Sequence, residues 1–382
     1  MGKTNFLFLA LVSTFVVLAH AEDPYLFYTW NVKYATLSPL GVPQQVITIN
    51  DQFPGPWINS TSNNNIVVNV FNHLDEPLLF TWNGIQQRKN SWQEGTLGTN
   101  CPIQPGTNFT FHFQVKDQIG SYYYYPTTAL HRAAGGYGPL TIHSRDLIPV
   151  PFDWPEAEYN VLVGDWYAKS HATLKKQLDA GRTIGKPDGV IINGKNGIFV
   201  NGVSHTNTET PLKLAEYFGV SDKVFKYDII KDEPAENVGD KITMAPNVIN
   251  ATFRNFVEII FENQEKSVQS WHLSGYSFFA VAIEPGRWTP EKRKNYNLID
   301  AVSRHTIHVY PKSWAAIMTT LDNAGMWNLR ALVLERQYLG QQLYISVLSP
   351  ERSLRDEYNM LDDQLVCGIV KGMPVPKPYA GA

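Results

Sequence analysis

Hydrophobic and polar residues alternate along several short segments of the chain, and this alternation predicts β-strands. In the clearest segment Phe109, Phe111 and Phe113 fall on one face, while the polar residues between them fall on the other. Similar strand-like runs cover residues 46–49, 66–71, 140–142, 257–261, 278–283 and 305–310. Prolines and glycines separate these runs, which is typical of an antiparallel sandwich or barrel. The run at 278–283 is apolar throughout, which predicts a buried strand.

The middle of the chain departs from this pattern. Residues 171–178 predict a helix. Residues 190–200 consist of two apolar runs around a Gly/Asn turn, and such a sequence indicates a local hairpin.

The first 21 residues have the pattern of a secretory signal peptide. A basic residue precedes the apolar run 6–18, and a small-residue site at 19–21 predicts cleavage before Glu22. The apolar run is too short to span a bilayer, and the polar, Pro-rich end of the chain lacks the hydrophobic tail of a lipid-anchor signal. We therefore expect a secreted, extracellular protein with no membrane anchor.

Charge identifies no partner class. The 32 basic and 35 acidic residues give a formal net charge of −3, and no basic face suggests nucleic acid.

Three sequons, at Asn59, Asn108 and Asn250, can carry glycans in a secreted protein. Asn59 lies in a polar stretch that predicts an exposed loop. Asn108 opens a predicted strand and Asn250 precedes one, so neighbouring residues could shield them.

The chain has two cysteines, Cys101 and Cys367. An oxidising compartment favours a disulfide between them, and two separate buried thiols are the alternative.

Two C-terminal stretches carry the most specific chemistry. Residues 269–276 read QSWHLSGY, and residues 322–341 contain DNAGMW, then RAL, and finally LGQ. They resemble the copper-ligand segments of the multicopper oxidases, which read HPxHxHG and DNPGxW followed by HCH, a further His and GM. In the N-terminal half LFTWNGI at 79–85 stands in place of the family's HWHGI, and a second His pair is replaced within 120–128.

The chain is thus similar, over essentially its whole mature length, to the copper-less plant branch of ascorbate-oxidase-like proteins, which includes pollen-specific and skewed-growth-related homologues. Of the family's ligands only His272 has a match. The other ligand positions hold Thr81, Asn83, Tyr125, Thr127, Gln269, Ser274, Arg330, Ala331, Leu332, Arg336 and Gln341.

The resemblance implies copper in the parent family, yet we expect no copper cofactor and no catalytic residues in this chain. A type 1 copper requires a thiolate, which Ala331 cannot supply, and no His-x-His pair remains for a trinuclear centre. We expect His272 to be a partly buried residue bonded to the backbone, because a lone imidazole binds copper weakly. No cluster stands out among the other histidines.

The replacements themselves suggest that the former copper cavity is a polar seam between domains or a site for a small anion. Arg and Tyr side chains can fill such a space with hydrogen bonds and stacking. Because unpaired guanidinium groups are costly in a dry cleft, acidic partners or an anion should lie near Arg330 and Arg336.

The resemblance also specifies an all-β fold of cupredoxin-like Greek-key barrels or sandwiches. Family members have three such domains, and 382 residues are too few for three. We expect a first domain at 22–145, a remnant of the second at 146–197, and a third at 198–382 that lacks its first strand or strands. A disulfide between Cys101 and Cys367 would join the first domain to the C-terminal tail, as in the family. A shortened gene product and an exon-skipped or misassembled gene model both explain the missing segment, and its length favours the latter.

The leading functional hypothesis is a secreted, glycosylated, non-catalytic protein of the cell wall or apoplast. The resemblance implies a role in wall organisation or directional pollen-tube growth, through binding of wall carbohydrate or protein. The sequence sets no oligomeric state. The alternatives are a copper-dependent, ascorbate-oxidase-like oxidoreductase and a fragment that does not fold. A fold does not confer an activity without the site, which favours the first hypothesis.

Overall fold

The computed structural model describes residues 24–145, 148, 158–192, 195–196, 209–227 and 247–381. The predicted signal segment and residues 193–194 and 197–200 of the predicted hairpin lie outside these ranges. Within them, no helix combines the length and apolar character needed to cross a membrane.

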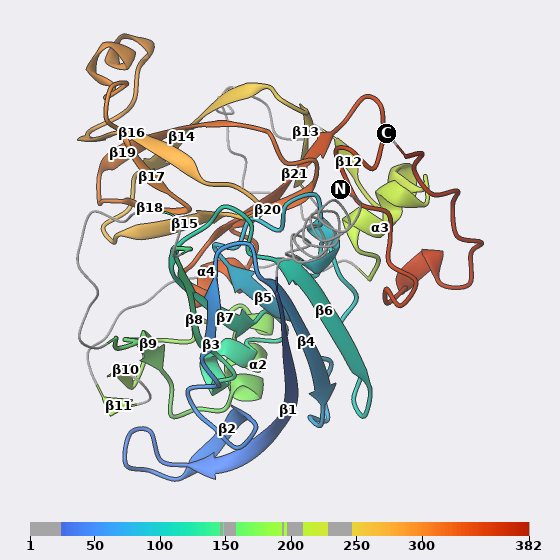
Figure 1. Cartoon of the computed structure of the whole chain (residues 1–382). Helices are drawn as coiled ribbons and strands as arrows, with labels where there is room; N and C mark the ends of the chain where they lie inside the picture. Colours follow the sequence, from blue (N-terminus) through green and yellow to red (C-terminus); the bar gives the residue numbers. More distant parts are fainter. Residues whose placement is uncertain are drawn as a thin grey trace, which may run out of the picture.

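The N-terminal part forms a sandwich of two four-stranded sheets (Figure 1). The first sheet has the order β2-β1-β4-β6, with β1 at Tyr25–Leu37, β2 at Gln44–Ile49, β4 at Asn65–Asn72 and β6 at Asn108–Gln114. The second has the order β3-β8-β7-β5, with β3 at Ile58–Thr61, β5 at Phe80–Asn83, β7 at Gly120–Pro126 and β8 at Gly138–His143.

Buried aromatic and β-branched residues fill the space between these two sheets, and the alternation that predicts β6 is confirmed. Phe109, Phe111 and Phe113 are buried in the core, whereas the residues between them are exposed or half-buried. Most strand pairs of this sandwich are antiparallel, as predicted, but β1 pairs in parallel with β4 and β3 pairs in parallel with β8.

The middle of the chain contributes one helix and a small sheet of order β11-β10-β9, made of Val163–Trp166 (β9), Gly189–Ile192 (β10) and Lys195–Asn196 (β11). The predicted helix is confirmed as α2, His171–Asp179, and the Ser170 hydroxyl caps it by accepting from the amide of Thr173. Strand β10 pairs antiparallel with β11, so the described part of the hairpin places its second strand earlier than predicted.

The C-terminal part forms a second sandwich. Its larger sheet has the order β12-β13-β21-β20-β15-β18. These strands are β12 at Lys226–Tyr227, β13 at Asn247–Thr252, β21 at Gln342–Leu348, β20 at Gly325–Ala331, β15 at Gln269–Leu273 and β18 at Thr306–Val309. The facing sheet has the order β14-β19-β16-β17, with these strands at Phe256–Asn263, Ser313–Thr320, Phe278–Pro285 and Val302–Arg304. Two short helices are α3 at Leu212–Tyr217 and α4 at Leu334–Tyr338. The 3₁₀ turns are η1 Ser91–Gln93, η2 His131–Ala134, η3 Ser221–Lys223, η4 Pro290–Asn295 and η5 Gly368–Val370.

Strand β16 corrects the prediction of a buried strand at 278–283. Phe278 and Val281 are buried, but Phe279 is 51% exposed and Ile283 45% exposed. Both faces of this strand carry buried residues, since Phe278 lies in the core between the two sheets and Val281 packs with Trp314 and Ala316 in a separate cluster. A bulge between Ala280 and Ala282 interrupts the alternation, so exposure varies along the strand and not simply between its two faces.

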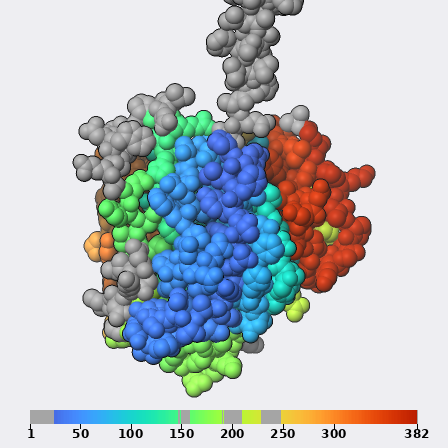
Figure 2. Space-filling view, turned by 60° about the horizontal axis from the view of Figure 1, so that its bottom comes forward, coloured from blue at the N-terminus to red at the C-terminus, as the bar shows by residue number. Residues whose placement is uncertain are grey.

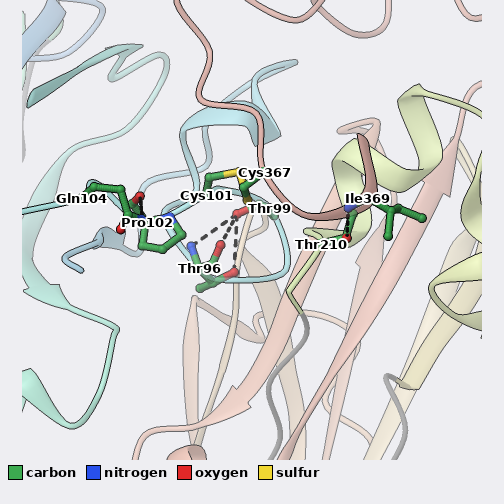
Figure 3. The surroundings of a disulfide bond; sticks show 8 residues. All are labelled: Thr96, Thr99, Cys101, Pro102, Gln104, Thr210, Cys367 and Ile369. Atoms are coloured by element: carbon green, nitrogen blue, oxygen red, sulfur yellow. Dashed lines mark hydrogen bonds between the residues drawn. A yellow bond between two sulfur atoms is a disulfide. The ribbon is translucent and has the colours of Figure 1, made fainter. Parts of the chain in front are cut away.

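A disulfide between Cys101 and Cys367 ties the first sandwich to the C-terminal tail, with its sulfur atoms 2.08 Å apart (Figure 3). Beside it the amide of Ile369 donates to the Thr210 hydroxyl at 2.9 Å. The tail is also held by Lys213, whose buried ammonium lies 2.6 Å from Glu357. Figure 2 shows the C-terminal segment lying along one side of the N-terminal strands.

The three sequon asparagines are exposed. The loop predicted for Asn59 was wrong, because Asn59 lies in β3 and its amide oxygen is 2.7 Å from His143 Nε2. Asn108 opens β6 as predicted, and Asn250 lies inside β13.

Candidate functional site

Arg330 lies at the centre of the positions that match copper ligands. It is on β20, directly across from His272 on β15, and its side chain is completely buried. In Figure 1 these two strands border β5 and β7 of the first sandwich. The guanidinium therefore sits where the two sandwiches meet.

The hydrogen bonds of Arg330 reach both sandwiches. Its Nε donates to the Tyr125 hydroxyl at 3.1 Å, and Nη1 donates to the Ser274 hydroxyl at 2.7 Å. Its Nη2 lies 3.5 Å from Thr81 Oγ1 and 3.4 Å from Asn83 Oδ1. One guanidinium thus connects four of the positions at which the motif resemblance predicts replaced copper ligands.

Glu94 supplies the negative charge opposite Arg330, and sequence reasoning did not name it. Its Oε1 accepts from Arg330 Nη1 at 3.2 Å and from the Ser274 hydroxyl at 2.6 Å. Its Oε2 accepts from the amide of Thr96 at 3.0 Å and from the Thr99 hydroxyl at 3.1 Å. All four lone-pair directions of this buried carboxylate are therefore engaged.

The loop that carries Glu94 is held by Thr81 and by one further replaced position, Thr127. The Thr81 hydroxyl donates to the carbonyl of Glu94 at 2.8 Å, and the Thr127 hydroxyl donates to the carbonyl of Gly95 at 2.8 Å. Gly95 has a φ of +82°, and a Cβ there would lie 1.6 Å from the Phe80 carbonyl oxygen, so the turn requires glycine.

A sequence signal for Glu94 does exist. It is the only Asp, Glu, Lys or Arg between Lys89 and Lys116, so a lone carboxylate stands in a long uncharged stretch. Such a carboxylate is either solvated or paired on burial with a distant cation, and here the pairing is with Arg330.

Electrostatics favour a charged Arg330 and a neutral His272. Burial disfavours the charge on Arg330, but Tyr125 and Glu94 outweigh it and raise the pKa of the guanidinium. Burial, followed by the charge of Arg330 and by His305, holds the pKa of His272 well below its ordinary value. The imidazole donates from Nδ1 to the His305 carbonyl at 2.7 Å, which confirms the expected backbone bond.

The remaining matched positions form a second region. The Gln269 side-chain Nε2 lies 3.3 Å from Asn263 Oδ1, and the backbone amide of Ala331 donates to the carbonyl of Gln341 at 2.9 Å. Arg336 pairs with Glu265, with Nη1 at 2.9 Å from Oε1. The Leu332 carbonyl accepts from Arg132 Nη2 at 2.7 Å.

Each arginine thus has an acidic partner, as the cost of burying an unpaired charge predicts, but the two arginines belong to separate pairs. The donors of Arg330 are taken up by protein groups. The contacts therefore favour the polar seam over the small-anion site.

The residues at these positions do not fit a copper centre. A buried guanidinium stands among hydroxyl and amide groups where the parent family has paired imidazoles, and no thiolate faces Gln269 or Arg336, since both cysteines are in the disulfide. Hydroxyl and amide donors around a fixed cation offer neither the ligand type nor the charge that copper requires.

A further group overturns the expectation that no histidine cluster exists. Glu76, His131 and His171 place their ligating atoms within 4.8 Å of one another. Since 55 residues separate Glu76 from His131 and 40 more separate His131 from His171, only the folded chain brings them together.

Sequence comparison now places the chain in a family. Two family models, both described as multicopper oxidase, match residues 31–147 and 209–353. Over nearly their whole lengths, this chain and a relative from Brassica napus are 48% identical, with 98% of each covered. The chain belongs to the multicopper oxidase family.

The Brassica napus relative is described as an L-ascorbate oxidase homolog. The chain is also 31% identical to the monocopper oxidase-like protein SKS1 of Arabidopsis thaliana, with 98% of this chain and 94% of the relative covered. The solved structure of a laccase from Botrytis aclada has the same fold, with a TM-score of 0.63 at 18% identity and coverage of 85% of this chain and 88% of that chain. The predicted all-β, cupredoxin-like fold is confirmed.

The comparison with the Brassica napus relative bears on the length of this chain. The alignment spans 547 positions, whereas this chain has 382 residues, so a long segment of the relative faces a gap here. The position of that gap, and the domain boundaries expected from it, stay predictions.

Proposed function

We propose that this protein is a secreted, glycosylated member of the multicopper oxidase family that acts in the plant cell wall by binding and not by copper catalysis. The observation that carries the proposal is the buried Arg330 guanidinium, which is bonded to Tyr125, Ser274 and Glu94. These contacts fill the seam in which the parent family binds copper.

The chemistry of the family supports the non-catalytic half of the proposal. Electron transfer from substrate to oxygen needs a thiolate-bound copper and a cluster of imidazole-bound coppers. At the corresponding positions this chain has Ala331, Arg330 and His272, and His272 uses its Nδ1 on a backbone carbonyl. No route for electrons is left through these residues.

A secreted location is supported by the disulfide, which persists in oxidising compartments, and by three exposed sequon asparagines. The relatives from Brassica napus and Arabidopsis thaliana support a role in plants. Wall organisation and directional pollen-tube growth follow from the resemblance to the copper-less plant branch.

Carbohydrate binding through a broad tryptophan surface has little support. Among the tryptophans that the structure describes, only Trp57 is exposed, and its indole Nε1 donates to the Thr141 hydroxyl at 3.0 Å. The aromatic content serves mostly the two cores, so a wall ligand would meet exposed tyrosines and polar strands.

The test is metal analysis of tag-free protein purified after secretion and offered excess copper, together with visible absorption and oxygen uptake on ascorbate and a phenol. An active ascorbate oxidase prepared in parallel is the control. We expect no blue thiolate-copper band and no oxygen uptake. Several tightly bound coppers with turnover would overturn the proposal in favour of an oxidoreductase.

The binding half needs its own measurement. Protein immobilised through its C-terminus is offered pectin, xyloglucan and cellulose fragments in separate titrations. Saturable binding of one class supports the proposal. The proposal is contradicted if the protein binds none of these polysaccharides and also retains no wall protein from extracts after washing in salt.

A further inference from the structure

A second polar cluster combines three separate segments of the chain. Glu76 lies in the loop between β4 and β5, His131 opens η2, and His171 opens α2. The side-chain amide of Asn72 holds the Glu76 loop because its Nδ2 donates to the carbonyl of Glu76 at 2.8 Å. The fold thus brings two imidazoles and one carboxylate to a single point.

The carboxylate of Glu76 faces both rings. Its Oε1 is 2.8 Å from His171 Nε2, and its Oε2 is 3.4 Å from His131 Nε2. The other ring nitrogen of His131, Nδ1, is 3.0 Å from the Thr128 hydroxyl. This hydrogen bond orients the ring so that Nε2 points into the cluster, which is the arrangement that supports histidine ligands in metal sites.

The surroundings favour ligation over solvation. The side chains of His131 and His171 are 0% and 4% exposed, while Glu76 is 33% exposed and leaves a path from solvent. The hydrogen bond from His131 has the largest effect on the pKa of Glu76 and lowers it. Burial raises this pKa and His171 lowers it further, so that it falls to about 2. Burial lowers the pKa of His131, so a carboxylate and a neutral imidazole coexist at neutral pH.

Tyr34 completes the cluster from β1. Its hydroxyl is 3.2 Å from Glu76 Oε1 and 3.5 Å from His171 Nε2. An oxygen from this hydroxyl or from water is therefore available as a fourth ligand, next to the two nitrogens and the carboxylate.

We propose that Glu76, His131 and His171 bind one divalent transition-metal ion, and that the ion is Zn²⁺. Two imidazole nitrogens, one carboxylate and an open fourth position are a common donor set for Zn²⁺. Mg²⁺ and Ca²⁺ prefer oxygen ligands alone, and the absence of a thiolate from this cluster disfavours Cu⁺.

The ion would fasten α2 to the first sandwich. Leu174 and Leu178 of α2 already pack against Leu130 and Ala133 around η2, and the metal would add a bond at the first residue of the helix. The site uses none of the positions matched to copper ligands, so this inference does not rest on the proposed function.

The test uses tag-free, full-length protein stripped with EDTA and titrated with Zn²⁺ by calorimetry, with Co²⁺ as a spectroscopic substitute. We expect one Zn²⁺ per chain, a rise in melting temperature with Zn²⁺, and the visible bands of a Co²⁺ site with nitrogen and oxygen ligands. Glu76→Gln and His171→Gln should each weaken Zn²⁺ binding at least about tenfold. His112→Gln, which changes an exposed histidine on β6, should leave it unchanged.

Either of two results would overturn the site. One is the absence of saturable one-to-one Zn²⁺ binding by the unmutated protein. The other is a Zn²⁺ affinity in Glu76→Gln and His171→Gln that equals that of the unmutated protein. If those variants fail to fold, X-ray absorption on the Zn²⁺-loaded unmutated protein tests the site. A zinc coordination sphere without two imidazole ligands would contradict the assignment.

A copper titration separates this inference from the proposed function. One Cu²⁺ that is lost in His171→Gln and gives no blue band supports this site and leaves the proposed function intact. Several coppers that persist in His171→Gln and support oxygen uptake would overturn the proposed function without bearing on the zinc site.

Discussion

The guanidinium of Arg330 and the carboxylate of Glu94 form a buried ion pair between the two sandwiches, with Nη1 3.2 Å from Oε1. Arg330 comes from β20 of the second sandwich, and Glu94 follows η1 of the first. Thr81, Tyr125 and Ser274 are among the residues that bond to one or both of them. The boundary between the two sandwiches is therefore held by a buried cation and its counter-charge.

Removal of one member of this pair should be strongly destabilising. Arg330→Met leaves Glu94 buried without its cation, and Glu94→Gln leaves Arg330 without its anion. Breaking a buried pair on one side costs about 3 to 5 kcal/mol, which we expect as a fall in the free energy of unfolding measured with urea.

The double variant and a surface pair provide the controls for this prediction. Glu94→Gln combined with Arg330→Met should lose much less than the sum of the single losses, because neither charge is then stranded. Arg293→Gln breaks an exposed pair with Glu258 and should have a far smaller effect. Additive losses in the double variant would show that the pair is not coupled.

The disulfide between Cys101 and Cys367 should contribute stability without determining the fold. The cysteines are 266 residues apart, so the bond restricts a very long loop in the unfolded chain. On the chain-entropy account, the double variant Cys101→Ala with Cys367→Ala should lose up to about 5 kcal/mol in the free energy of unfolding.

The tail should still dock without the disulfide, because the Trp92 indole donates to the Tyr358 carbonyl at 3.0 Å and Lys213 pairs with Glu357. Limited proteolysis checks this point. Faster cleavage of the tail together with an otherwise resistant body is the expected pattern. Equal unfolding free energies for the double variant and the parent would refute a stabilising role.

Mild acid should weaken the protein through His272 and His305. Burial holds the pKa of each below the ordinary value of 6.5, and Arg330 adds to the effect on His272 while Arg304 adds to it on His305. As pH falls through 6.5 the unfolded chain takes up protons that the folded chain refuses. The stabilisation is therefore complete above that pH and is lost below it.

Urea unfolding between pH 8 and pH 5 measures this dependence. His272→Asn can keep a donor to the His305 carbonyl but cannot titrate, so its unfolding free energy should change less with pH than that of the unmutated protein. If the unfolding free energy of the variant changes with pH as steeply as that of the unmutated protein, His272 does not contribute to the pH dependence.

Local pattern predicted much of the fold. The alternation of Phe109, Phe111 and Phe113 identified β6 because both faces of a strand are encoded in neighbouring residues. The cap residue Ser170 and the apolar spacing at Leu174 and Leu178 explain why α2 was also predictable. Strand β16 was misjudged because an apolar sequence reveals neither the bulge between Ala280 and Ala282 nor the positions that neighbouring residues leave uncovered.

The Arg330 pair and the Glu76 cluster depend on contacts between residues that lie far apart in the sequence. Motif spacing located Arg330, and the cost of burying its charge predicted an acidic partner. That partner, Glu94, lies 236 residues away and has no motif of its own. Likewise His131 and His171 meet Glu76 only because η2, α2 and the loop after β4 pack together. Pairings at such separations follow from the tertiary fold and not from any local periodicity.

The turn at Gly95 gives the sharpest test of how the seam is built. Gly95 and Gly106 both have positive φ, at +82° and +73°, so an alanine at either position carries a conformational cost of about 1 to 2 kcal/mol. At Gly106 no atom lies within 4 Å of the added Cβ, whereas at Gly95 the Phe80 carbonyl oxygen lies 1.6 Å away. Gly95→Ala must therefore move the loop that carries Glu94 away from β5 and break its contact with Arg330. We expect Gly95→Ala to lower the melting temperature far more than Gly106→Ala, and equal losses in the two variants would show that the close packing of this loop against β5 does not hold the seam together.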